Sequence, residues 1–196
     1  DAVASAAGVT PFKTVQELTA DDYTAAFQGK VLAQIELVRQ GIHHIAADGS
    51  FTLITGVLAR SPIVTGAAAS MAGGALESFV RAAAIEIAPQ RINAISPTVF
   101  TEALEVYGDY FPGFPSVGLA EVGQAYVRSI EGKQTGQIYE LDRVPGNPNQ
   151  PPYSHRLKDT PHMMPATTFT TTPARNSYDV VIIGGATAGS AVAWFL

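Results

Sequence analysis

The residues with the clearest chemical meaning lie at the end of the chain. An apolar, β-branched stretch that begins after Asp179 runs into Gly184 and Gly189, and no charged residue occurs from Val180 to Leu196. A strand, a glycine-rich turn and a helix in this order place backbone N–H groups beneath a pyrophosphate. Ala186 stands at the middle glycine position of Gly-x-Gly-x-x-Gly, where a methyl group hinders close approach. The pattern still predicts a dinucleotide-binding unit.

Composition excludes several classes of partner. The net charge is -5, the isoelectric point is about 5.3 and no basic cluster occurs, so we expect no nucleic-acid binding. The apolar stretch at the C-terminus is shorter than the roughly 20 residues that a bilayer requires, so we expect no membrane span. Cysteine is absent, and no export signal begins the chain, which favours the cytoplasm.

The histidines and carboxylates do not predict a metal site. His43 and His44 are adjacent, so their side chains do not face the same way on a helix. No group of Asp, Glu and His residues has the spacing of a ligand set. We therefore expect no bound metal.

Strands alternate with helices in residues 1–142, and this pattern predicts an α/β fold. Such alternation favours a Rossmann-like parallel sheet with helices on both faces. The strands are expected at 2–7, 50–55, 91–95 and 136–141, and the helices at 19–45, 67–88 and 118–130. An irregular aromatic segment occupies 101–118. Residues 143–177 have linker composition, and 178–196 form the separate strand and helix unit.

Residues 1–142 resemble the short-chain dehydrogenase/reductase family from its fourth strand to its seventh. The similarity rests on Ser5–Gly8, Ser50–Gly56 and Arg91–Pro97, where the family has Asn-Asn-Ala-Gly, the strand leading to its catalytic serine, and Arg-Val-Asn-Ala-Val-Ser-Pro-Gly. The resemblance implies an N-terminally truncated Rossmann domain and an NAD(P)-dependent oxidoreductase of a small-molecule substrate. It also implies cofactor contacts at Ala7, Gly8, Thr55, Pro97 and Thr98.

The family's catalytic groups are missing from the matching positions. The family uses a Tyr and a Lys for proton transfer, a Ser to hold the substrate oxygen and an Asn for a water relay. Aligned on Ala75-Leu76-Glu77, these positions fall on Ala69, Gly73, Gly56 and Lys30. The segment resembles a divergent subgroup of the family that lacks the Tyr and Lys.

Several side chains are candidates to replace that chemistry. Lys30 could present an ammonium to a substrate oxygen, although a helical lysine is usually solvated. Thr55 and Ser70 could hydrogen-bond a carbonyl, or satisfy local backbone groups. The aromatic segment 101–118 could fold over a cleft. Tyr110, with Tyr107, could then bring a phenolic acid into that cleft, or its ring could pack over the cleft.

The C-terminal unit resembles the start of flavin-dependent oxidoreductases, since Gly184 and Gly189 match the first and third glycines of their opening motif. This resemblance makes FAD a second candidate cofactor. We also expect 179–183 to pair in parallel with 2–6 and complete the sheet, because an uncovered apolar strand edge favours aggregation.

Two alternatives to an enzyme remain open. The chain could be a non-catalytic nucleotide-binding or dimerising scaffold, or a non-functional fused fragment. The family resemblance implies a homo-oligomer formed through helices 19–45 and 67–88, with Ala82, Ala83 and Ala84 allowing close helix approach.

Overall fold

The computed structural model describes residues 1–142 and 180–184. A single parallel sheet runs through this part of the chain in the order β4-β3-β2-β1-β5. The strands are β1 (Ala2–Ser5), β2 (Ser50–Ile54), β3 (Arg91–Pro97), β4 (Ile138–Leu141) and β5 (Val180–Ile183).

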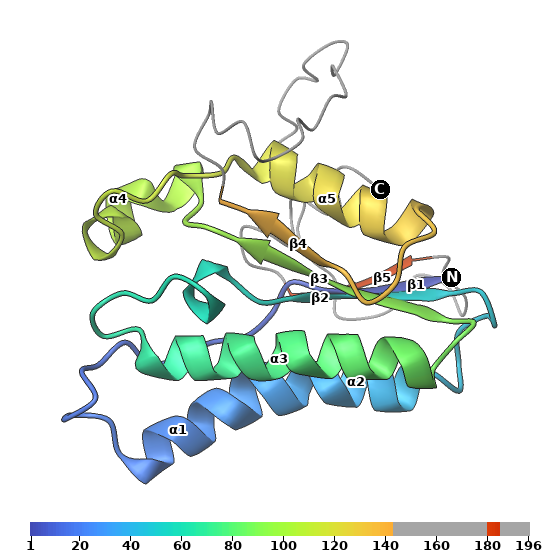
Figure 1. The fold of residues 1–196 in the computed structure, drawn as a ribbon, viewed down its shortest axis with the longest axis horizontal. Helices are drawn as coiled ribbons and strands as arrows, with labels where there is room; N and C mark the ends of the chain where they lie inside the picture. Colours follow the sequence, from blue (N-terminus) through green and yellow to red (C-terminus); the bar gives the residue numbers. More distant parts are fainter. Residues whose placement is uncertain (143–179, 185–196) are drawn as a thin grey trace, which may run out of the picture.

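Helices cover both faces of the sheet (Figure 1), so the expected Rossmann-like α/β class is confirmed. One face carries α1 (Ala20–Ala26), a π-helical segment η1 (Phe27–Leu32), α2 (Ala33–Gly41) and α3 (Ala67–Glu86). The other carries α5 (Leu119–Glu131). Short helical turns occupy the connections: η2 (Val57–Ala59), η3 (Thr101–Ala103), α4 (Leu104–Tyr107) and η4 (Gly108–Tyr110).

The strand from the C-terminal end pairs with the first strand of the chain, which confirms the expected repair of the sheet. Its register runs in parallel from Ala2 opposite Val180 to Ser5 opposite Ile183. The amide of Ala6 extends the ladder by donating to the carbonyl of Ile183 at 2.7 Å. The linker 143–177 and the glycine turn beyond Gly184 lie outside the described residues, so the proposed domain boundaries there stay a prediction.

The helix expected at 19–45 begins as predicted but is shorter and interrupted. Its start is a reciprocal cap, because the Asp22 amide donates to Thr19 Oγ1 at 3.2 Å and the Thr19 amide donates to Asp22 Oδ2 at 2.9 Å. The helix then passes through the π-helical segment η1 and ends at Gly41. A Cβ on Gly41 would lie 2.6 Å from Cε1 of Phe51, so glycine allows close packing on β2 there.

The core fills both sides of the sheet. On the side of α2 and α3, the largest fully buried side chains come from the two central strands and from α3: Phe51, Leu53, Leu76, Val80 and Ile92. On the side of α5, Tyr126 and Val122 pack against Ile95, Tyr139 and Leu141. This packing fixes the C-terminal ends of the strands relative to one another.

Tyr126 ties α5 to the end of β1, and we expect Tyr126→Phe to lower the free energy of unfolding by about 1 kcal/mol. Its buried hydroxyl donates to the carbonyl of Ser5 at 2.6 Å, and the variant leaves that carbonyl without its partner. Urea unfolding monitored by circular dichroism measures the change. Tyr107→Phe, at a side chain that is half exposed, is the control and should change stability by less than about 0.5 kcal/mol. Equal effects of the two variants would contradict this assignment.

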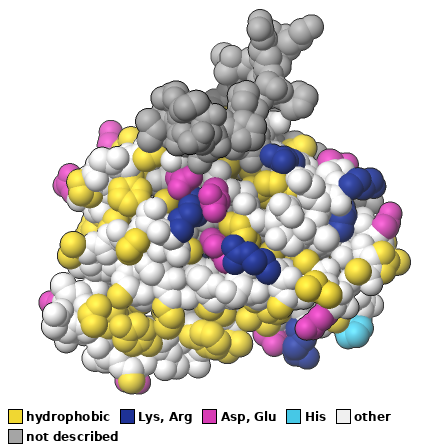
Figure 2. Space-filling model, in the orientation of Figure 1, with side chains coloured by type: hydrophobic (Ala, Val, Ile, Leu, Met, Phe, Trp, Pro, Cys, Tyr) yellow, Lys and Arg dark blue, Asp and Glu magenta, His cyan; other side chains and the backbone are white. Residues whose placement is uncertain are grey.

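The expected use of Ala83 and Ala84 in a subunit interface is wrong. Ala83 and Ala84 are 5% and 9% exposed, because they face the chain's own core. A large side chain at either position would disrupt the monomer instead of an interface. The outer side of this helical layer carries other apolar side chains, and Figure 2 shows hydrophobic groups gathered over α1 and the start of α3. Its exposed large members include Phe27, Leu32, Met71 and Ile85.

Pairing of two copies through this helical layer stays a prediction, and Ile85 provides its test. Ile85 lies on α3 and is 82% exposed, so a charge there should weaken a dimer without unfolding the protomer. We expect Ile85→Arg to shift the mass measured by light scattering from dimer towards monomer. Val106→Arg on α4, at a residue 68% exposed, is the matched control and should leave the mass unchanged. A wild-type chain that is monomeric at high concentration would contradict the pairing.

Candidate functional site

The predicted cofactor contacts gather at one edge of the sheet. Strands β1, β2 and β3 run parallel, so the segments that follow them leave the sheet on the same side. These segments begin with Ala6–Gly8, Thr55–Gly56 and Thr98. Ligands of open α/β sheets bind outside the carboxyl ends of the strands, and this edge is therefore the candidate site.

Lys30 reaches this edge from the π-helical segment η1. Its Nζ donates to the carbonyl of Thr55 at 3.2 Å, and its stem passes against Gly8. Gly8 has φ 134°, and a Cβ there would lie 2.9 Å from Lys30 Cγ. Among the described residues, no carboxylate lies within 4 Å of the amino group. Burial lowers the pKa of Lys30 from 10.5 to about 8, because desolvation disfavours the charged form.

Gln34 fixes the helical segment that carries Lys30. Its buried amide forms a two-way bridge to β2, accepting from the Ile54 amide at 2.8 Å and donating to the Ile54 carbonyl at 3.0 Å. The same amide nitrogen donates to the carbonyl of Lys30 at 3.2 Å. A π-helical turn leaves a carbonyl without its usual partner, and Gln34 supplies one here. The sequence analysis missed this role, although a glutamine on an inward helix face was a visible signal.

The hydroxyl of Thr55 is already engaged by a buried carboxylate. Thr55 Oγ1 donates to Glu77 Oε1 at 3.2 Å, and Ser96 Oγ donates to the same oxygen at 3.1 Å. Arg60 Nη1 in turn donates to Ser96 Oγ at 2.6 Å, and Arg60 Nη2 pairs with Asp142, just after β4, at 2.9 Å. This network positions the ends of β2, β3 and β4, and its members Glu77 and Arg60 were not anticipated. The signal for Glu77 was a carboxylate on the buried face of an Ala-rich helix.

The other candidate side chains form no hydrogen bond with the amino group of Lys30 in the described part of the chain. Thr98 Oγ1 donates to the carbonyl of Pro115 at 2.8 Å, so it holds the loop that follows β3. Tyr110 is 48% exposed and its ring centroid lies 5.9 Å from that of Phe12, which is the packing alternative considered above. Ser70 Oγ is buried and has no hydrogen-bond partner among the described residues.

Three of the four positions that align with the family's catalytic groups carry no titratable side chain, and the fourth is Lys30. Gly56 follows β2, and Ala69 and Gly73 lie one turn apart on α3. A Cβ on Gly73 would lie 3.1 Å from the Cβ of Ala59, so η2 has closed against the helix at this point. A lysine at 73 would require that turn to move.

Gly184 brings the C-terminal unit to the same edge. It has φ 116°, and a Cβ there would lie 2.7 Å from the carbonyl carbon of Ala6. Only glycine allows β5 to end so close to the segment that follows β1. Gly189, which matches the third glycine of the predicted motif, lies outside the described residues. The flavin site therefore stays a prediction.

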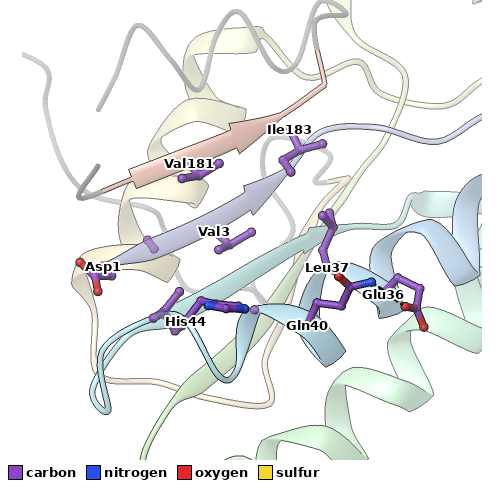
Figure 3. A pocket seen from close by; sticks show the side chains of 11 residues that line it. Asp1, Val3, Glu36, Leu37, Gln40, His44, Val181 and Ile183 are labelled. Atoms are coloured by element: carbon purple, nitrogen blue, oxygen red, sulfur yellow. Dashed lines mark hydrogen bonds between the residues drawn. The ribbon is translucent and has the colours of Figure 1, made fainter. Parts of the chain in front are cut away.

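A hollow of the described structure lies elsewhere, on the helical face beside β5. It measures about 620 Å³ and separates Val3 of β1 and Val181 of β5 from Leu37 and His44 (Figure 3). No group of three His, Cys, Asp or Glu residues in the described ranges could hold a metal ion. In the same ranges, no helix has the length and apolarity to cross a membrane.

Comparison with known proteins identifies the family of the chain. Residues 1–116 match the family model described as Enoyl-(Acyl carrier protein) reductase. The chain belongs to the short-chain dehydrogenase/reductase family of oxidoreductases. A probable tetrahydroxynaphthalene reductase of Zymoseptoria tritici is 27% identical over 74% of this chain and 57% of its own length. A short chain dehydrogenase of Emericella nidulans is 30% identical over the same shares.

Solved structures of short-chain dehydrogenases/reductases share the fold. The protein lin1944 of Listeria innocua is 41% identical with a TM-score of 0.71, covering 72% of this chain and 71% of that one. A small-chain dehydrogenase in complex with NADPH is 25% identical with a TM-score of 0.66, covering 72% of each chain. The chain spans between 38% and 57% of the length of the curated relatives named or matched here.

Proposed function

We propose that this chain is a nicotinamide dinucleotide-binding domain of the short-chain dehydrogenase/reductase family that lacks the family's usual proton transfer. The observation that carries the proposal is the completed edge, in which β5 pairs with β1 and places Gly184 beside the segment that begins with Ala6. The 25% identical structure with NADPH supports the same cofactor class.

The residues at the edge fit a dinucleotide. Gly8 and Gly184 adopt positive φ values, and their lack of side chains lets Lys30 and the segment that begins with Ala6 pack closely at the ends of β1 and β5. Ala7, Thr55, Pro97 and Thr98 would line the cofactor along the edge, as the family resemblance implies. When bound, a nicotinamide dinucleotide supplies hydride transfer.

The proposed function does not include proton transfer by the Tyr and Lys that the family uses. Alanine at 69 and glycine at 73 cannot donate or accept a proton, and losing a positioned acid typically costs about 10²–10⁴-fold in rate. Lys30 is a candidate to interact with a substrate, because its amino group donates to the carbonyl of Thr55 at the end of β2. Its ammonium would hold an oxygen of a small molecule near Thr55.

Titration of NADPH and NADH against the purified chain tests the proposal, with cofactor fluorescence and thermal shift as readouts. We expect saturable binding of at least one of them, and no oxidation of NADPH when ketones and aldehydes are added. The absence of binding to both would overturn the proposal, and binding of FAD alone would favour the flavin hypothesis.

Carbonyl turnover would overturn the second half of the proposal. If NADPH oxidation occurs, it is measured again in Lys30→Met and in Tyr110→Phe. The variant that abolishes the oxidation identifies the residue that acts as the acid. Gly113→Ala is a control far from this chemistry, since a Cβ there meets nothing within 4 Å.

A further inference from the structure

Lys30 has the surroundings of a nucleophile and not those of a structural cation. Structural buried ammonium groups are paired with carboxylates, because an unpaired charge is costly to desolvate. Among the described residues, the amino group of Lys30 has one hydrogen-bond partner, the neutral carbonyl of Thr55, and no carboxylate within 4 Å. Burial at this position therefore costs the neutral amine less solvation free energy than it costs the ammonium.

The structure holds the acceptor of this amino group rigidly. The Thr55 amide donates to the carbonyl of Ile95 at 2.8 Å, and its hydroxyl donates to Glu77 at 3.2 Å. Gln34 holds the backbone of Lys30 itself. Both the amine and the carbonyl that orients it are thus fixed by buried contacts.

We propose that Lys30 binds aldehydes or ketones covalently and reversibly as an imine at this edge. This inference names a substrate class for the site of the proposed function and rests on that function for the choice of carbonyl compounds. Burial lowers the pKa of Lys30 to about 8, so an appreciable fraction of unprotonated amine exists near neutral pH.

The bond changes balance without a further reactant. The lone pair of Nζ attacks the carbonyl carbon, the carbonyl oxygen takes up a proton, and one proton leaves the nitrogen to give a carbinolamine. The hydroxyl of the carbinolamine takes up a second proton from solvent, the C–O bond breaks and water leaves, while the lone pair of Nζ forms the C=N bond of a protonated imine. The protonated imine keeps one N–H, which can donate to the Thr55 carbonyl in place of the ammonium.

Reductive trapping tests the inference on the full chain without any dinucleotide. The chain is incubated with propanal and sodium cyanoborohydride at pH 7.5, and the propylated lysines are identified by peptide mapping. The chain has four lysines, Lys13, Lys30, Lys133 and Lys158, so the wild type contains its own comparators. We expect Lys30 to be labelled at least about tenfold faster than Nα-acetyl-lysine under the same conditions, because a lysine of ordinary pKa is almost fully protonated there.

Two further readouts separate a site from general surface labelling. The rate at Lys30 should rise with pH and level off above about 8, the pKa that burial gives this amine. Among the groups that contact Lys30 from β2, the loop after β1 and α2, which are Thr55, Gly8 and Gln34, none is charged. Lys30→Arg should remove the label at this position and leave the other lysines unchanged.

Labelling of Lys13 or Lys133 as fast as Lys30, or a rate at Lys30 that rises only near pH 10, would overturn the inference. Failure to bind NADPH would not, because trapping needs no cofactor. Success in binding NADPH with no selective trapping would leave the proposed function standing and remove the imine.

Discussion

Lys30→Met should make the protein more stable at pH 7, although it removes a hydrogen bond. Burial lowers the pKa of Lys30 from 10.5 to about 8, so the native state carries this charge at a cost of at most about 3 kcal/mol. The side chain is partly exposed, and the bond to Thr55 is lost in the variant. We therefore expect a gain of about 1–2 kcal/mol in the free energy of unfolding, measured by urea denaturation.

The gain should depend on pH in a defined window. Between about 8 and 10.5 the unfolded chain keeps the Lys30 proton while the native chain releases it, so the wild type gains stability as pH rises. The difference between Lys30→Met and the wild type should therefore shrink across this window. Lys30→Arg is the control, because arginine stays charged. This variant should not stabilise the protein at pH 7 or within the window. A Lys30→Met protein less stable than the wild type at pH 7 would show that the amine's bonds outweigh its desolvation.

Gly184→Ala should release β5 from the sheet. A Cβ at 184 would lie 2.7 Å from the carbonyl carbon and 2.8 Å from the carbonyl oxygen of Ala6, and backbone atoms of a paired strand cannot move aside. We expect the amide of Ala6, which donates to Ile183, to exchange with solvent at least about tenfold faster, which corresponds to about 1.4 kcal/mol or more of lost local stability.

Gly113→Ala provides the matched control for this effect. Gly113 also has a positive φ, of 79°, but a Cβ there meets nothing within 4 Å. Its substitution carries the cost of the backbone conformation, about 1 kcal/mol, without a clash. Unchanged exchange at Ala6 in Gly184→Ala, or equal changes in both variants, would contradict the role of Gly184 at the edge.

Much of the fold was predictable because its signals are local. Alternating apolar strands and capped helices indicate a parallel α/β sheet, and the cap at Thr19 formed as its sequence predicts. Even the pairing of β5 with β1 followed from an apolar strand that needed a neighbour. The element ends were less accurate: β1 ends at Ser5 instead of residue 7, and α2 ends at Gly41 instead of about residue 45. Gly41 lies against the ring of Phe51, a contact between distant parts of the chain that local signals do not indicate.

The candidate site was less predictable, since its contacts depend on tertiary structure. Lys30 was identified as a candidate, but its single carbonyl partner and lowered pKa arise from the π-helical turn and the burial that Gln34 and Gly8 create. Glu77 lies on α3 well away in sequence from Thr55 and Ser96, and no spacing rule indicates that one carboxylate accepts from both. Ala83 was misplaced for the same reason, because helix periodicity alone did not determine which face of α3 meets the sheet.

The pairing of β5 with β1 has a consequence for the order in which the protein folds. Ala2 pairs with Val180, so this contact closes a loop of roughly 180 residues, whereas β1, β2, β3 and β4 meet through shorter crossovers. At about 5–20 residues per second, the ribosome would deliver β5 about 10–40 s after β1. During that interval β1 lacks the strand that pairs with it along this edge in the native structure, and the edge is available to strands of other chains. Nascent chains should therefore depend on chaperones until Val180 has emerged, and a slowed ribosome should increase their aggregation.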